Sequence, residues 1–218
     1  PLLRFFTGKS GEDKMSLDVF VAAMPEGQKA IYYVTGDGKN NALLSPVLEK
    51  LKGYDYDALL ATEPLDEIMI ETLKKYKDFD IVDAAKENLK LDKNKEDDEE
   101  AKKKDEALQE QWKLVSEYLE TLLSEKVQKV TVSDLLSDSP AVIVQGAYGM
   151  SPTMQRYMRA QSVSSGTGDN IMGGMNKAVL EINPKHPIIK DIERMVKGDK
   201  DSKELEDFAL LMYDVASM

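Results

Sequence analysis

The sequence has no cysteine and a single histidine, His186, among its 218 residues. The lack of cysteine excludes disulfides and thiolate metal sites, and one histidine makes a histidine-based zinc site or a Ser-His-Asp triad a poor prediction. No nucleophile adjoins His186, so we expect it to hydrogen-bond locally rather than act as a catalytic base. No apolar run approaches the roughly 18 residues that a membrane span requires, and no signal peptide is visible.

Positive charge is also scarce. The chain has 29 Lys and Arg residues against 40 Asp and Glu residues, a net charge of −11. This balance argues against nucleic acid as the main partner, because phosphate binding needs concentrated positive charge. An apolar fraction of 42% can form real cores, in one large domain or in two of about 100 residues. Because the chain begins with Pro-Leu-Leu-Arg, we expect it to be part of a longer protein.

Strands and helices alternate in the first part of the chain. Short β-branched and aromatic runs predict strands at residues 30–35, 58–61 and 79–82. Apolar residues at helical spacing predict helices between them, one of which covers residues 65–76. We expect that helix to pack through an apolar stripe of Ile68, Met69, Thr72 and Leu73. The alternation predicts a small α/β layer with a partly parallel sheet.

Residues 92–106 form a charge run in which thirteen of fifteen residues are Asp, Glu or Lys. Such blocks are solvated linkers or exposed helix starts, so the run predicts a domain boundary. Beyond it, Leu108, Trp112 and Leu119 lie at helical spacing and predict a long amphipathic helix. We expect the single tryptophan, Trp112, to anchor that helix in the core rather than to contact a ligand.

The second half predicts strands at residues 127–132, 141–145 and 178–182, the first two as neighbours. A helix is expected to start at Asn183-Pro184 or at His186-Pro187, and another helix ends the sequence. This last helix has an apolar face that includes Leu205, Phe208, Met212 and Val215. Such a face either packs on its own domain or meets a partner chain.

The loop after residues 30–35 opens like a dinucleotide-binding fingerprint with Gly36 and Gly38. The third glycine of that fingerprint would fall at Asn41, and no phosphate-binding Gly-Lys-Ser/Thr sequence is present. A turn is therefore the favoured interpretation.

Methionines concentrate between residues 150 and 175. Met150, Met154 and Met158 recur every four residues and would share a helix face, with Tyr157 beside them. A glycine-rich run then carries Met172 and Met175. The spacing alone favours a buried face, whereas the glycine-rich run favours an adaptable surface for apolar partners, which methionine suits.

Several motifs, in this order and spacing, resemble the heat-shock protein 90 chaperone family nearly end to end. The stretches that carry this resemblance are Gln28–Gly36, Glu63–Glu67, Met154–Gln161 and Leu180–Pro187. The resemblance implies that residues 1–92 are the distal part of that family's middle domain, a small three-layer α/β subdomain. Residues 93–107 would be a charged linker or helix start. Residues 108–218 would be an α+β C-terminal dimerisation domain with long helices and a short sheet, lacking its last helix.

The resemblance further implies an ATP-driven, dimeric chaperone whose nucleotide pocket and catalytic arginine loop lie in absent parts. We therefore expect no catalytic residue, cofactor or metal in this chain, and ATP with magnesium in the absent N-terminal domain. The expected partners are client proteins, possible co-chaperones and, weakly or not at all without the last helix, a second copy. The implied location is intracellular, with the cytoplasm favoured over mitochondria or plastids.

By the same resemblance, two sets of residues carry the expected sites. The client-contact residues are Met150, Met154, Tyr157, Met158, Met172 and Met175. The dimerisation residues are Leu205, Phe208, Met212 and Val215. The competing hypothesis is a purely structural dimerisation module in which the methionine face is buried. A small α/β enzyme that uses the Gly36 loop ranks last.

Overall fold

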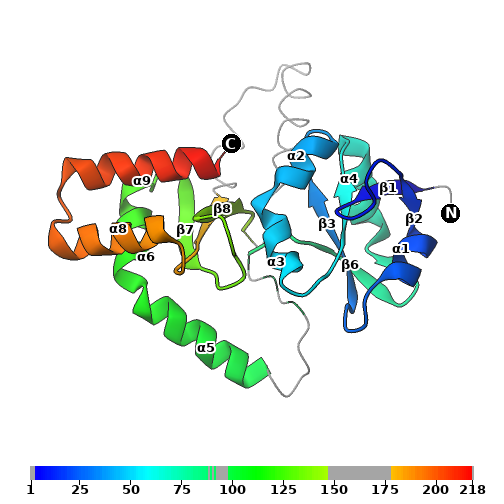
Figure 1. The fold of residues 1–218 in the computed structure, drawn as a ribbon, viewed down its shortest axis with the longest axis horizontal. Helices are drawn as coiled ribbons and strands as arrows, with labels where there is room; N and C mark the ends of the chain where they lie inside the picture. Colours follow the sequence, from blue (N-terminus) through cyan, green and yellow to red (C-terminus); the bar gives the residue numbers. More distant parts are fainter. Residues whose placement is uncertain (1–2, 88, 90, 92–97, 147–177, 218) are drawn as a thin grey trace. The chain divides into compact units, whose positions relative to one another are not determined.

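The computed structural model describes residues 3–87, 89, 91, 98–146 and 178–217 (Figure 1). Contacts divide the chain into two compact units, with the division after Asp92. The described part of the first unit ends at residue 91. The described part of the second comprises residues 98–146 and 178–217. Both units combine helices with a sheet, which confirms the prediction of a mixed α/β chain.

The described residues of the first unit form a six-stranded sheet in the order β2-β1-β4-β3-β6-β5. Its strands are β1 (Arg4–Thr7), β2 (Met15–Ser16), β3 (Ala30–Thr35), β4 (Ala58–Ala61), β5 (Lys75–Tyr76) and β6 (Phe79–Asp83). β3 lies in the centre and pairs in parallel with β4 and β6, while the outer pairs are antiparallel. The partly parallel sheet is therefore confirmed. Every residue of β4 and all but the last of β3 are buried, as expected for strands that are covered on both faces.

The helices of this unit connect its strands. They are α1 (Leu17–Ala23), α2 (Lys39–Leu44), the 3₁₀ helix η1 (Pro46–Leu48), α3 (Glu49–Lys52) and α4 (Pro64–Leu73). Ser16 begins α1 by accepting a hydrogen bond from the Val19 N–H at 3.3 Å. α4 ends earlier than predicted because Lys74 takes a positive φ of 53° and the chain turns into the β5–β6 hairpin.

The predicted packing face of α4 was wrong. Ile70 and Glu67 are the buried residues of this helix, whereas Met69 and Leu73 are exposed. The helix has apolar residues on two sides, and the side that carries Ile70 packs on the sheet. Periodicity identifies apolar stripes, but it cannot say which of two stripes meets the neighbouring layer.

The second unit has a three-stranded sheet among its described residues, with helices packed against it. Its elements are α5 (Asp98–Gln111), α6 (Lys113–Leu122), β7 (Val127–Val132), β8 (Ala141–Val144), β9 (Ala178–Ile182), α8 (Pro187–Gly198) and α9 (Lys203–Ala216). α8 and α9 form an antiparallel hairpin (Figure 1). His186 begins α8: its Nδ1 accepts a hydrogen bond from the Ile188 N–H at 3.2 Å, which confirms the local role predicted for it.

The predicted pairing of β7 with β8 was wrong. The strand order is β7-β9-β8, so β9 lies between them, parallel to β7 and antiparallel to β8. Burial explains the order. β9 is buried on both faces from Val179 to Ile182, whereas β7 exposes Gln128 and Lys129. The strand that is buried on both faces takes the centre.

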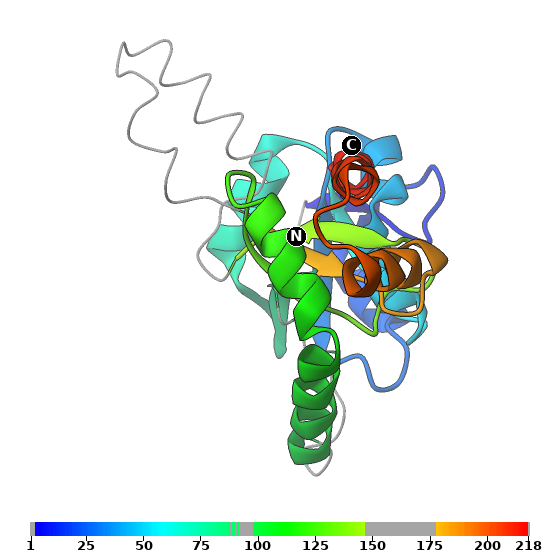
Figure 2. The ribbon, with the colours of Figure 1, turned by 90° about the vertical axis from the view of Figure 1, so that its left-hand side faces the viewer.

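The long helix predicted beyond the charge run is two successive helices, α5 and α6, which meet at Trp112 (Figure 2). Trp112 has φ −100° and ψ 7°, and its side chain is only 5% exposed. It belongs to the core cluster that also contains Leu119, Leu180 and Ile192. The prediction that Trp112 is a core anchor is confirmed.

Candidate interaction surfaces

The six residues predicted to contact clients lie outside the described residues. They are Met150, Met154, Tyr157, Met158, Met172 and Met175. Their role therefore stays a prediction. The four predicted dimerisation residues all lie on α9, within the described part of the chain.

One side of α9 packs within its own unit. Leu205, Ala209 and Met212 are buried in the core of the second unit, and the helix contacts α8 and β8. Leu205 is 0% exposed, so it supports the helix from inside. This side of α9 takes the first of the two arrangements left open by the sequence, packing on its own domain.

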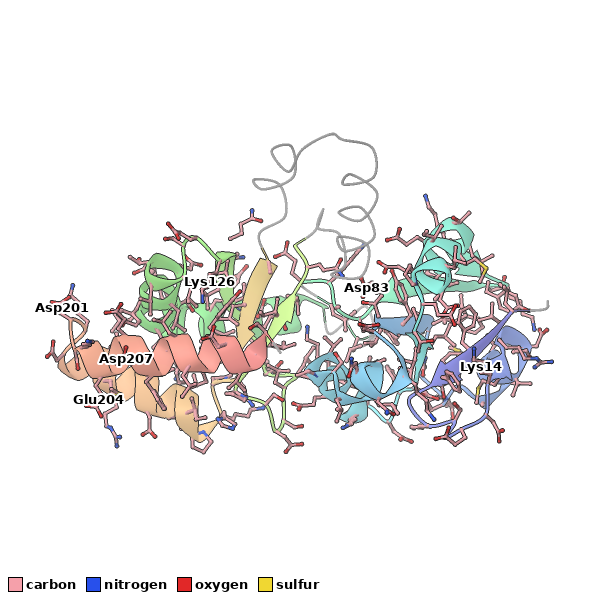
Figure 3. The ribbon with its side chains drawn as sticks, turned by 90° about the horizontal axis from the view of Figure 1, so that it is seen from above. Lys14, Asp83, Lys126, Asp201, Glu204 and Asp207 are labelled. Carbon is pink, nitrogen blue, oxygen red and sulfur yellow. The ribbon has the colours of Figure 1, made fainter. Side chains whose placement is uncertain are left out.

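The side of α9 that adjoins this buried face presents apolar residues to solvent. Leu211 is 61% exposed and Val215 is 57% exposed, with Phe208 half-buried one turn earlier. Their spacing places all three on one helix face. We call Phe208, Leu211 and Val215 the α9 outer stripe. Glu204 and Asp207 lie on the first half of the same helix, so the stripe has an acidic end (Figure 3).

The predicted dimerisation set thus divides between positions of α9 that are buried in the core and positions that face solvent. Leu205 and Met212 face the core, while Phe208 and Val215 belong to the α9 outer stripe. Leu211 is not among the predicted dimerisation residues. Its position three residues after Phe208 and four before Val215 is the signal that would have found it.

Lys126 contacts two residues in the second half of α9. Its Nζ lies 4.7 Å from the centroid of the Tyr213 ring and 3.3 Å from Oδ1 of Asp214. Lys126 is labelled in Figure 3 and lies in the turn between α6 and β7. Exposed contacts of this kind contribute about 1 kcal/mol or less each. Their effect is therefore to orient the helix rather than to stabilise the fold.

A second exposed apolar stripe lies on α4 in the first unit. Leu65, Met69 and Leu73 are spaced four residues apart and are 69%, 36% and 38% exposed. We call them the α4 stripe. A row of exposed apolar side chains on one helix face is typical of an interaction surface rather than of a single stray residue.

Acidic groups are buried at the base of α4. Glu67 is buried on the inner side of the helix, and Asp83 is buried at the end of β6. Asp83 Oδ1 accepts a hydrogen bond from the Ala85 N–H at 2.8 Å. Burial first, and the charge of Glu71 to a lesser extent, raise the pKa of Asp83 to about 6. The Ala85 hydrogen bond and the charges of Lys86 and Lys50 oppose this rise.

We expect Asp83→Asn to stabilise the folded chain above about pH 6, by about 1 to 3 kcal/mol. The folded-state pKa of Asp83 is raised from 3.8 to about 6. The stability contributed by its proton is therefore present in full below pH 3.8 and is lost as pH rises through about 6. Asparagine keeps the acceptor for Ala85 and carries no charge.

Melting temperatures of parent and Asp83→Asn at about pH 8 and about pH 5 test this prediction, because the gap between them should shrink at the lower pH. Asp80→Asn, at an exposed position of the same strand, is the control and should change little. A gap of equal size at both pH values would contradict the prediction.

The chain was also compared with known proteins. A sequence model of the family described as "Hsp90 protein" matches residues 1–218. The chain belongs to the Hsp90 family. The resemblance seen in the motifs is therefore confirmed over the whole sequence.

Relatives of this Hsp90-family chain come from several compartments. It is 42% identical to "Heat shock protein 90-5, chloroplastic" and 39% identical to "Heat shock protein 90-6, mitochondrial", both from Arabidopsis thaliana, and each match covers 99% of this chain. It is 38% identical to "Endoplasmin homolog" from Catharanthus roseus over 100% of its length. The matches cover 27%, 26% and 26% of those proteins, so the chain spans about a quarter of the length of these relatives.

No group of three or more His, Asp or Glu side chains among the described residues could hold a metal ion. No helix in the described ranges has the length and apolar character needed to cross a membrane.

Proposed function

We propose that this chain is part of an ATP-dependent molecular chaperone that binds unfolded or partly folded client proteins and contributes to homodimerisation. The observation that carries the proposal is the match to the Hsp90 family along all 218 residues. The two exposed apolar stripes support it, because a chaperone needs solvent-accessible apolar surface to meet partly folded chains.

The proposed client surface combines the predicted methionine-rich segment with the α4 stripe. Met154 and Met158 come from the sequence, and Met69 and Leu73 are exposed on α4. Methionine and leucine give a non-directional, adaptable contact that accepts many sequences. Co-chaperones are further possible partners, and the sequence gives no reason to add nucleic acid.

Serine substitutions on the α4 stripe should weaken client binding. We expect Met69→Ser with Leu73→Ser to weaken binding of a partly unfolded client by about 30-fold, since each loses about 1 kcal/mol of apolar contact. The melting temperature should change little, because both side chains are exposed. Binding titrations with a labelled, partly unfolded protein measure the effect. The matched control is Val19→Ser, which changes a 53% exposed residue on α1 of the same unit. Equal loss in the control would remove the α4 stripe from the proposal.

The same assay distinguishes the purely structural alternative. If the methionine face is buried, Met154→Ser with Met158→Ser should lower the melting temperature by several degrees, as core truncations do. If the methionine face contacts clients, the two substitutions should leave the melting temperature unchanged and weaken client binding. Unchanged client binding with an unchanged melting temperature would exclude these two methionines from the client site.

For pairing, we propose that the α9 outer stripe contributes to homodimerisation. The stripe has two exposed residues, Leu211 and Val215, and the half-buried Phe208. This area is small beside the roughly 800 Å² per partner that a stable interface needs. We therefore expect the 218-residue chain to pair weakly, with further contacts supplied by residues outside it.

Light scattering over a wide concentration range tests the pairing. Leu211→Ser with Val215→Ser should raise the dissociation constant of any dimer by about tenfold. Leu114→Ser, at a 50% exposed position on α6, should leave it unchanged. A tight dimer that is insensitive to Leu211→Ser with Val215→Ser would place the interface elsewhere.

We further propose that the nucleotide site and its magnesium lie outside residues 1–218, and that this chain contributes no catalytic residue. The absence of a nucleotide-binding motif from the sequence supports this. We propose an intracellular location, in the cytoplasm or in an organelle such as the mitochondrion or the plastid. Two of the relatives are named for the chloroplast and the mitochondrion.

A further inference from the structure

β7 is an edge strand of the described sheet in the second unit, with β9 on one side. The Ser133 N–H donates to the Ile182 carbonyl at 3.0 Å, so the backbone groups of residue 133 point toward β9. Backbone groups alternate in direction along a strand. Val130 and Val132 therefore direct theirs away from β9, toward the open edge.

Side chains from two helices occupy these outward groups. Gln109 of α5 bonds Val132 twice: its Oε1 accepts from the Val132 N–H at 3.0 Å, and its Nε2 donates to the Val132 carbonyl at 2.7 Å. Glu120 of α6 accepts from the Val130 N–H at 2.9 Å. One amide side chain that both donates and accepts reproduces the pattern that a neighbouring strand would offer.

Without these contacts, β7 would be a strong template for strand pairing. Four of its six residues are β-branched, namely Val127, Val130, Thr131 and Val132, and Lys129 is its one charge. A β-branched edge strand with free N–H and C=O groups pairs readily with another chain. Lysine on an edge opposes such pairing, but one lysine leaves most of this strand unprotected.

We propose that Gln109 and Glu120 close the β7 edge, and that removing them lets β7 pair with β7 of a second copy of this chain. The consequence goes beyond the proposed function and does not depend on it. A protein that handled extended segments of other chains would gain from keeping its own sheet closed to them.

The test uses the absence of cysteine from this chain. Lys129→Cys places a single thiol at an exposed position of β7. The variant is made in the parent chain and again together with Gln109→Ala and Glu120→Ala. Mild oxidation should give a disulfide-linked dimer in the triple variant and little or none in Lys129→Cys alone. Light scattering of the Gln109→Ala, Glu120→Ala chain should show a mass that rises with concentration above that of the parent.

Destabilisation has to be separated from opening of the edge, because the double variant loses three hydrogen bonds to β7 and also the hydrogen bond from Gln109 to Asp105. Val115→Ala, at a buried position of α6, lowers stability while leaving Gln109 and Glu120 in place. It is combined with Lys129→Cys and compared at the same temperature below its own melting point. Glu120→Gln keeps an acceptor for Val130 and should behave like the parent. The single Gln109→Ala variant, which removes two of the three bonds, gives the same comparison should the double variant fail to fold.

Cross-linking confined to chains that lack Gln109, or both Gln109 and Glu120, supports the proposal. Hydrogen exchange adds a signature that mere unfolding would not give: residues 127–133 should exchange faster than in the parent in dilute solution and regain protection in the assembly. Equal cross-linking of Lys129→Cys alone, or of the Val115→Ala chain, would overturn the proposal. An edge that exchanges faster but never cross-links would overturn it as well.

Discussion

Replacing Trp112 by alanine is expected to lower the free energy of unfolding of the second unit by about 3 to 5 kcal/mol. Trp112 is 5% exposed, stands between α5 and α6, and packs in the cluster with Leu119 and Ile192. The lost indole leaves a cavity that neighbours on a helix junction cannot readily fill. The melting temperature should fall by more than about 10 °C. Circular dichroism measures it, because the variant has no tryptophan left to fluoresce.

Two variants separate this effect from a general response of the helix. Leu114→Ala changes a 50% exposed residue on α6, the helix that follows Trp112, and should alter stability by about 0.5 kcal/mol or less. Trp112→Phe keeps an aromatic ring in the core and should fall between the two. Trp112→Ala should also speed amide exchange at Val132, because Gln109 lies one turn before Trp112 on α5. A Trp112→Ala chain as stable as Leu114→Ala would show that Trp112 is not a core anchor.

Local patterns predicted the elements of this fold well. The run from Ala30 to Thr35 and that from Ala58 to Ala61 became strands at the predicted bounds, because each is a short, continuous run without polar alternation that is buried on both faces. His186 begins a helix at one of the two predicted starts, since a cap depends only on the residues beside it.

Partner choice between distant elements was beyond the sequence. β7 and β8 are near in sequence, yet β9 separates them, because the order depends on burial of both faces of β9. The inner face of α4 was likewise missed: it carries Glu67, a residue that composition assigns to the surface. Only the packing of α4 on the sheet distinguishes Ile70 from Met69.

The candidate surfaces show the same limit. The sequence placed Leu205, Phe208, Met212 and Val215 on one face of the last helix, and that apolar face is wider than the part of it that packs on the core. Which side faces inward depends on α8 and β8, and so Leu211 was overlooked. Two members of the α4 stripe, Met69 and Leu73, were predicted to pack on the sheet and are exposed instead. The six client-contact residues remain a prediction from family resemblance.

Replacing Gly36 by alanine is expected to lower the free energy of unfolding of the first unit by about 2 to 3 kcal/mol. A Cβ atom at Gly36 would lie 2.6 Å from the Ala42 nitrogen and 2.7 Å from its Cα. These are backbone atoms of α2, so the helix itself would have to move away from the end of β3. The Gly36 N–H also donates to the Ala61 carbonyl at 3.1 Å, which ties this position to β4.

Gly53→Ala is the matched control, because nothing lies within 4 Å of an added Cβ there and its backbone is already helical, with φ −61° and ψ −18°. It should be neutral or stabilise by about 0.5 kcal/mol. The comparison also bears on function, since the enzyme hypothesis places a bound nucleotide close to the backbone of Gly36. If Gly36 serves packing alone, Gly36→Ala should melt earlier, and ATP or a dinucleotide should not shift the melting temperature of the parent. A nucleotide-dependent rise in the parent that Gly36→Ala abolished, without a loss of its own stability, would reverse that conclusion and restore this loop as a binding site.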